Sequence, residues 1–208
     1  PTEMPTAQLP TPTQPVIVHT PTGRAYVPIA ADVIYDNYFL RTGPGRMFET
    51  IRMYATGDRV TLLARERGNN WVLVQTSDNR SGWMNVVGLQ LTGDVTPLPI
   101  LAVPAAQVIK GHVYRTDHTP ATLIGVSIAN VNDSSPDLQD VSITNQAGEW
   151  FIYLPLDKDG DWVIGVNSYR PQSNAGHASG ALLGPLPGAQ KITLPLAADV
   201  NYEFSLLP

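Results

Sequence analysis

The side chains in this sequence best suited to chemistry are aromatic rings and arginines in its first half. Tyr35, Tyr38 and Trp71 could line a groove, because aromatic rings bind ligands through their faces while their polar atoms form hydrogen bonds. Arg41 would add guanidinium donors, although it could instead bond to neighbouring backbone carbonyls. We therefore expect Tyr35, Tyr38, Arg41 and Trp71 to form a ligand-binding site.

Two tryptophans in this region have different expected environments. Trp83 is flanked by Gly82 and apolar residues, which favours a place in the core. Trp71 follows two turn residues, so its ring is either a partly exposed platform or a core side chain. The sequence leaves these two interpretations of Trp71 open.

Patterns for metal binding are weak. The four histidines, at positions 19, 112, 118 and 177, are too scattered for a metal motif, even with Asp117 beside one of them. The segment 157–161 is similar to a calcium loop, but its glycine comes too early and Ser168 stands where a glutamate is required. A solvated turn is the better interpretation, and we expect no metal site.

Patterns for catalysis are also missing. Ser179 lies near His177 but without the Gly-x-Ser-x-Gly turn that exposes a nucleophilic serine. The sequence has no phosphate loop, zinc helix or dinucleotide fingerprint. We expect neither enzymatic activity nor a cofactor.

Composition limits the class of protein. Charged residues make up 15% of the 208 residues, which with 17 Gly and 19 Pro indicates a turn-rich, all-β chain. Residues 24–92 hold eight arginines against six acids, whereas residues 108–208 hold five basic residues against ten acids. Neither half has the dense basic clusters of a nucleic-acid-binding protein, so we expect no nucleic-acid partner. Cysteine is absent, which excludes disulfides and thiolate chemistry.

The ends of the sequence suggest a piece of a larger protein. No apolar run reaches the roughly 20 residues of a membrane span. The chain starts with Pro1 rather than methionine, so we expect further sequence upstream, where a signal peptide, anchor or other domain could stand.

Turn and strand signals divide the chain into four segments. Residues 1–24 are rich in Pro and Thr and are expected to form an extended spacer or stalk. Residues 25–92 contain five or six short strands, which predicts a small β-barrel. Residues 93–107 form a Pro-containing linker that is too apolar to be free in water. Residues 108–208 carry seven strand signals and predict a β-sandwich with a long Gly/Ser-rich loop at 172–188.

The first β segment resembles the bacterial SH3-like domain. The resemblance rests on FLRTGPG at 39–45, GDRVTLL at 57–63, NWVLVQT at 70–76 and SGWM at 81–84, with Met84 where the family usually has Val. It covers about a third of the chain. It implies extracellular or periplasmic life and binding of cell-wall polymers or peptides, without catalysis.

The second β segment resembles the carboxypeptidase-regulatory-like domain, a transthyretin-type (prealbumin-like) sandwich. The resemblance rests on IKGHVY at 109–114, GVSIAN at 125–130, TNQAGEWFIYLP at 144–155 and DWVIGV at 161–166. Trp162 takes the place usually held by Tyr. The resemblance implies a spacer or adhesive module beside another domain.

Together these features predict a non-catalytic, extracellular or cell-surface binding module of bacterial type. Its expected partner is a cell-wall polymer, a polysaccharide or a peptide, held by the barrel. The alternative is a structural spacer that displays a domain outside this sequence. In that case the barrel aromatics would be covered by the linker or by the sandwich.

Overall fold

The computed structural model describes residues 26–133, 135–167, 188–197 and 199–206. The described residues form an all-β fold, with two single-turn 3₁₀ segments, η1 (Val86–Gly88) and η2 (Pro136–Leu138), as their helical parts. No helix among them is long and apolar enough to cross a membrane. The expected stalk, and most of the loop at 172–188, lie outside the described residues.

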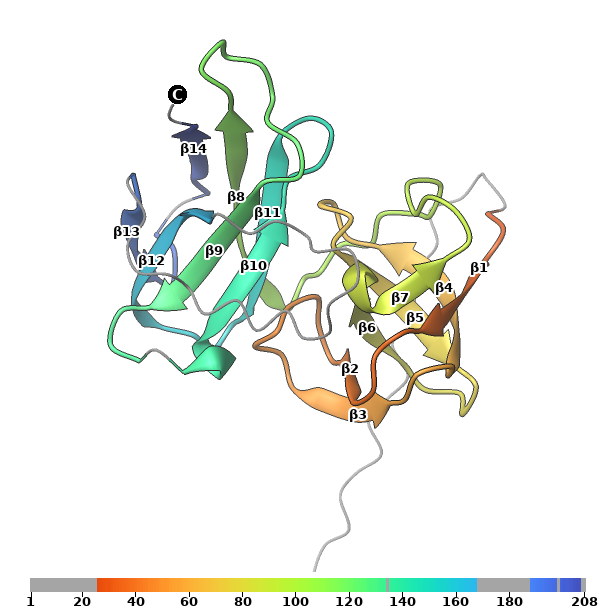
Figure 1. Cartoon of the computed structure of the whole chain (residues 1–208). Helices are drawn as coiled ribbons and strands as arrows, with labels where there is room; N and C mark the ends of the chain where they lie inside the picture. Colours follow the sequence, from red (N-terminus) through yellow and green to blue (C-terminus); the bar gives the residue numbers. More distant parts are fainter. Residues whose placement is uncertain (1–25, 134, 168–187, 198, 207–208) are drawn as a thin grey trace, which may run out of the picture.

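The first seven strands form one sheet that curls on itself (Figure 1). Its strand order is β3-β2-β6-β5-β4-β1-β7. Strands from both ends of this order place side chains in a single buried cluster, including Leu40 of β2 and Leu89 of β7. A flat sheet could not bring these ends together, so we call residues 26–91 the barrel. Its strands are β1 (Ile29–Val33), β2 (Tyr38–Arg41), β3 (Thr50–Tyr54), β4 (Arg59–Arg65), β5 (Trp71–Thr76), β6 (Ser81–Asn85) and β7 (Leu89–Leu91).

The remaining seven strands form two sheets that face each other, and we call residues 106–206 the sandwich (Figure 1). One sheet has the order β10-β9-β12-β13, and the other has the order β11-β8-β14 with β14 parallel to β8. Trp150 and Trp162 are both essentially fully buried in the core between them. The strands are β8 (Ala106–Tyr114), β9 (Gly125–Asn130), β10 (Gln139–Ile143), β11 (Glu149–Pro155), β12 (Gly160–Asn167), β13 (Gln190–Leu194) and β14 (Asn201–Ser205).

Alternation along β8 shows how the sequence positions the two faces of its sheet. Burial alternates at every residue, and Ile109 and Val113 enter the sandwich core. Val108 and Lys110 therefore belong to the outer face, because successive side chains of a strand point to opposite sides. This outer face is the one that approaches the barrel.

The segment between the two units, residues 92–105, is packed rather than free. Val95 and Leu98 are buried in the barrel core. The Arg65 N–H donates to the Pro99 carbonyl and the Leu101 N–H donates to the Arg65 carbonyl, each at 2.9 Å, so the linker runs beside β4. Val95 and Leu98 of this segment thus have apolar partners in the barrel, whereas Ile100 is 49% exposed.

Candidate functional site

Tyr35 and Tyr38, two of the expected ligand-binding residues, lie together at the turn between β1 and β2. Both are half-buried, and their ring centroids are 6.3 Å apart. The Tyr38 hydroxyl donates to the Asn85 carbonyl at 2.7 Å and accepts from the Gly88 N–H at 3.0 Å. The ring lies so close to Gly88 that a Cβ there would clash with it. The polar atom of Tyr38 therefore joins β2 to the η1 turn.

Arg41 is also engaged within the protein. Its Nη1 donates to the Phe48 carbonyl at 2.8 Å, and the guanidinium lies 4.8 Å from the centre of the Phe39 ring. Desolvation in its half-buried position lowers the pKa of Arg41. The alternative role given above for Arg41, a hydrogen bond to a neighbouring backbone carbonyl, is thus one of its contacts.

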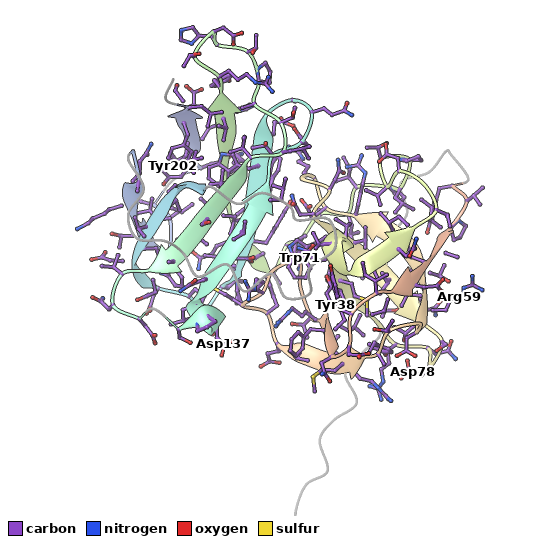
Figure 2. The ribbon with its side chains drawn as sticks, viewed as in Figure 1. Tyr38, Arg59, Trp71, Asp78, Asp137 and Tyr202 are labelled. Atoms are coloured by element: carbon purple, nitrogen blue, oxygen red, sulfur yellow. The ribbon has the colours of Figure 1, made fainter. Side chains whose placement is uncertain are left out.

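Trp71 lies in the core and not on a platform. It is 5% exposed and packs with Trp83, while Leu101 and Val103 of the linker cover this pair. Figure 2 shows Trp71 on the side of the barrel that faces the sandwich. The linker therefore occupies the place where a ligand would have to stack on this ring.

The loop between β2 and β3 docks on the sandwich. Phe48 of this loop forms a buried cluster with Phe151 and Tyr153 of β11. The Arg46 N–H donates to the carboxylate of Asp140 in β10 at 2.9 Å. A Cβ on Gly45 would lie 2.5 Å from the Tyr153 carbonyl oxygen, so only glycine permits this approach. The loop between β2 and β3, which contains the end of the FLRTGPG run, therefore forms part of the junction between the two units.

In a second contact between the two units, a side-chain amide of the barrel pairs with the backbone of a sandwich strand. Asn70, 7% exposed, accepts the Ile143 N–H on its Oδ1 at 2.9 Å, and its Nδ2 donates to the Ile143 carbonyl at 3.1 Å. Ile143 belongs to β10, the edge strand of the four-stranded sheet. The barrel therefore covers this sheet edge with one amide group, which satisfies backbone groups that would otherwise be exposed.

Two buried carboxylates lie at this junction. Glu66, from the turn after β4, is fully buried and accepts the N–H groups of Gly68, Asn70 and Trp71 as well as a hydrogen bond from Tyr153. Burial raises the pKa of Glu66 to about 6, although these bonds favour the charged form.

Asp140 is the corresponding carboxylate of the sandwich. It is 2% exposed and accepts the N–H groups of Arg46 and Val141. Burial raises the pKa of Asp140 to about 6, against the attraction of Arg46 and Arg41. Each unit thus buries one acid at the junction, with donors from the other unit among its partners.

Beside the junction lies a groove of about 800 Å³. Its walls are linker residues 100–103, the outer faces of β8 and β11, and the segment after β13, with Arg67 of the barrel among the lining residues. The volume is in the range of ligand sites in proteins. The groove exists only where barrel, linker and sandwich meet. We call it the junction groove.

The residues of this groove were not predicted from the sequence, although the pattern of β11 indicates that both of its faces are covered. The run WFIYL in β11 is apolar at every position, whereas a strand with one solvated face alternates. Trp150, Ile152 and Leu154 fill the sandwich core, and Phe151 and Tyr153 are buried on the outer face. A strand that is apolar on both faces indicates that something covers both, which here is the barrel.

The other candidate sites have the following places. His112 stacks on Tyr114 with ring centroids 5.8 Å apart and lies beside Glu149. Within the ranges the structure describes, no three His, Asp or Glu side chains are grouped to hold a metal ion. His177 and Ser179 lie outside the described residues.

Comparisons of this chain with protein-family models, with curated proteins and with solved structures gave no match.

Proposed function

We propose that this chain is a non-catalytic binding unit of an extracellular or cell-surface protein, and that it binds its ligand in the junction groove. The observation that carries the proposal is a groove of about 800 Å³ to which barrel, linker and sandwich all contribute. The resemblances to bacterial SH3-like and carboxypeptidase-regulatory-like domains support a cell-wall polymer, a polysaccharide or a peptide as ligand.

The geometry favours the junction groove over three of the four residues expected from the sequence. The Tyr38 hydroxyl and the Arg41 guanidinium have partners within the barrel, and Trp71 lies beneath the linker. Substituting Tyr38 or Trp71 would therefore disturb the fold as well as any ligand contact. Residues that line the groove but contribute little to a core make better probes.

Retention on insoluble peptidoglycan and common polysaccharides tests the proposal. Ile100 lines the groove and is 49% exposed, so Ile100→Asp places a charge in the groove without opening a core. Val87 is 43% exposed and is not among the groove residues, which makes Val87→Asp a matched control. We expect retention of the natural chain and of Val87→Asp, and at least a tenfold loss for Ile100→Asp. Equal retention of all three would exclude the groove as the binding site.

A structural spacer is the second candidate function. The specific observation in its favour is that Leu101 and Val103 cover Trp71 and Trp83, as expected if the barrel aromatics have a packing role. Under this alternative, no polymer retains the natural chain.

A further inference from the structure

Two buried carboxylates lie where the barrel meets the sandwich, and the first of them is Glu66. It is fully buried, and its donors within the barrel are the N–H groups of Gly68, Asn70 and Trp71. A further hydrogen bond reaches it across the junction, from Tyr153 of β11. None of the ion pairs in the described part of the chain includes Glu66. Its charge is therefore held by hydrogen bonds alone, and one of these depends on the other unit.

The barrel loop between β2 and β3 covers the second carboxylate, Asp140. A Cβ built on Gly45 of this loop would lie 3.0 Å from Asp140 Oδ2, and the Arg46 N–H donates to the same oxygen at 2.9 Å. The guanidinium groups of Arg46 and Arg41 attract Asp140 through their charge, but neither forms an ion pair with it. Asp137 of η2, next to β10, in turn attracts Arg41. Part of the cover over Asp140 thus comes from the barrel.

The other titratable groups that face Glu66 keep one charge state in mild acid. Burial and the charge of Glu66 raise the pKa of Tyr153, so its hydroxyl keeps its proton and only donates. Arg67, next to Glu66, opposes this rise but does not cancel it. Protonation in mild acid therefore acts on the two carboxylates rather than on these neighbours.

Separation of the two units would return water to both carboxylates. In the docked chain burial raises the pKa of Glu66 and of Asp140 to about 6, because desolvation disfavours the charged form. In separated units these pKa values would fall toward the ordinary 4.5 and 3.8. The docked form therefore binds more protons than the separated form. Its docking free energy is most favourable below the ordinary values and weakens as pH rises through about 6.

We propose that protonation of Glu66 and Asp140 controls the docking of the barrel on the sandwich, so that the junction closes most firmly in mild acid and opens more readily at neutral pH. This device goes beyond the proposed function, because it concerns how the junction groove forms and not what the groove binds.

Hydrogen exchange of single backbone amides in the full chain tests the proposal. The Ile143 N–H bonds to Asn70 of the barrel, so it exchanges when the two units separate. Ile128 is fully buried in β9, an inner strand of the same sheet, so its N–H exchanges when the sandwich itself unfolds. The protection factor, which is the ratio of the intrinsic to the observed exchange rate, removes the intrinsic effect of pH. Between pH 4.5 and 7 we expect the protection factor of Ile143 to fall about tenfold or more, and to stay below that of Ile128.

Variants of the two acids separate their effect from other titrations. Glu66→Gln and Asp140→Asn remove the titrating groups, and each should make the fall in the Ile143 protection factor smaller. Asp78→Asn is the matched control, because hydrogen bonds from Thr76 and Tyr54 lower the pKa of this barrel acid to about 2, below the range of the experiment. It should leave the fall unchanged.

Three results would overturn the proposal. The Ile143 protection factor could stay constant or rise with pH, or its fall could persist in full in both acid variants. Ile143 and Ile128 could also have equal protection factors at every pH, which would make separation and unfolding a single event. The natural chain alone supplies the first and third of these results, even where a variant does not fold. None of them depends on ligand retention, so this inference can fail while the proposed function stands.

Discussion

The Tyr38 hydroxyl is a polar group whose two hydrogen bonds serve the fold. It bonds to Asn85 and Gly88, whereas the neighbouring Tyr35 hydroxyl has no hydrogen bond to a described residue. Removing a hydroxyl that leaves partly buried backbone groups unpaired costs about 1–2 kcal/mol. Tyr38→Phe should lower the free energy of unfolding in urea by that amount, and Tyr35→Phe should change it by less. Equal effects of the two changes would contradict the structural role of Tyr38.

Trp71 illustrates why side-chain roles were harder to predict than strands. The two turn residues before Trp71 are a local property of the sequence, and β5 begins directly after them, at Trp71. Its burial depends on the linker, which begins about 20 residues later, and local pattern does not encode that contact. For the same reason local pattern did not identify Glu66 and Asp140, because each is buried with a partner from the other unit.

The turn after β4 and the edge strand β10 each bring a buried carboxylate to the junction. The pKa of Glu66 rises from 4.5 to about 6, and that of Asp140 from 3.8 to about 6. At pH values between the unfolded and the folded pKa of each acid, the folded protein therefore binds more protons than the unfolded chain does. Its free energy of unfolding should be highest below this window and fall as pH rises through it. The shifts correspond to about 2 kcal/mol for Glu66 and about 3 kcal/mol for Asp140.

Urea unfolding measured from pH 4.5 to 6.5 tests whether the free energy of unfolding falls as pH rises. Asp78 has its pKa lowered from 3.8 to about 2 by bonds from Thr76 and Tyr54, so it acts in the opposite sense but below this range. Glu66→Gln and Asp140→Asn should each reduce the slope of stability against pH, even where they lower stability itself. Stability that is constant or rises across this range would contradict the burial of the two acids.

The strands themselves were largely predictable from the sequence. Among the described residues, the seven strand signals expected at 108–208 correspond to β8 to β14, and the barrel segment has seven strands where five or six were expected. The all-β fold follows from turn residues and alternation, which act within a few residues. The placement of the barrel against the sandwich does not follow from such local signals. It depends on single contacts, such as Gly45 with Tyr153 and Asn70 with Ile143.

At the scale of the whole molecule, buried contacts join barrel and sandwich. Three kinds of contact join them: the aromatic cluster of Phe48, Phe151 and Tyr153, the amide of Asn70 on β10, and the two buried carboxylates. Figure 1 shows β10 and β11 as the sandwich strands beside the barrel. The junction groove requires this arrangement, since its walls come from both units. The junction groove therefore depends on the docking of the two units.

Rotational diffusion of the two units, measured by ¹⁵N relaxation, tests whether they are docked. In the natural chain, amides of both units should report one common correlation time. In Gly45→Ala, the new Cβ would lie 2.5 Å from the Tyr153 carbonyl oxygen, so the loop must leave β11 and the two correlation times should diverge. Gly93→Ala is the matched control, because nothing lies within 4 Å of a Cβ there, and it should behave like the natural chain. Two different correlation times in the natural chain, or a common one retained in Gly45→Ala, would contradict the docked arrangement.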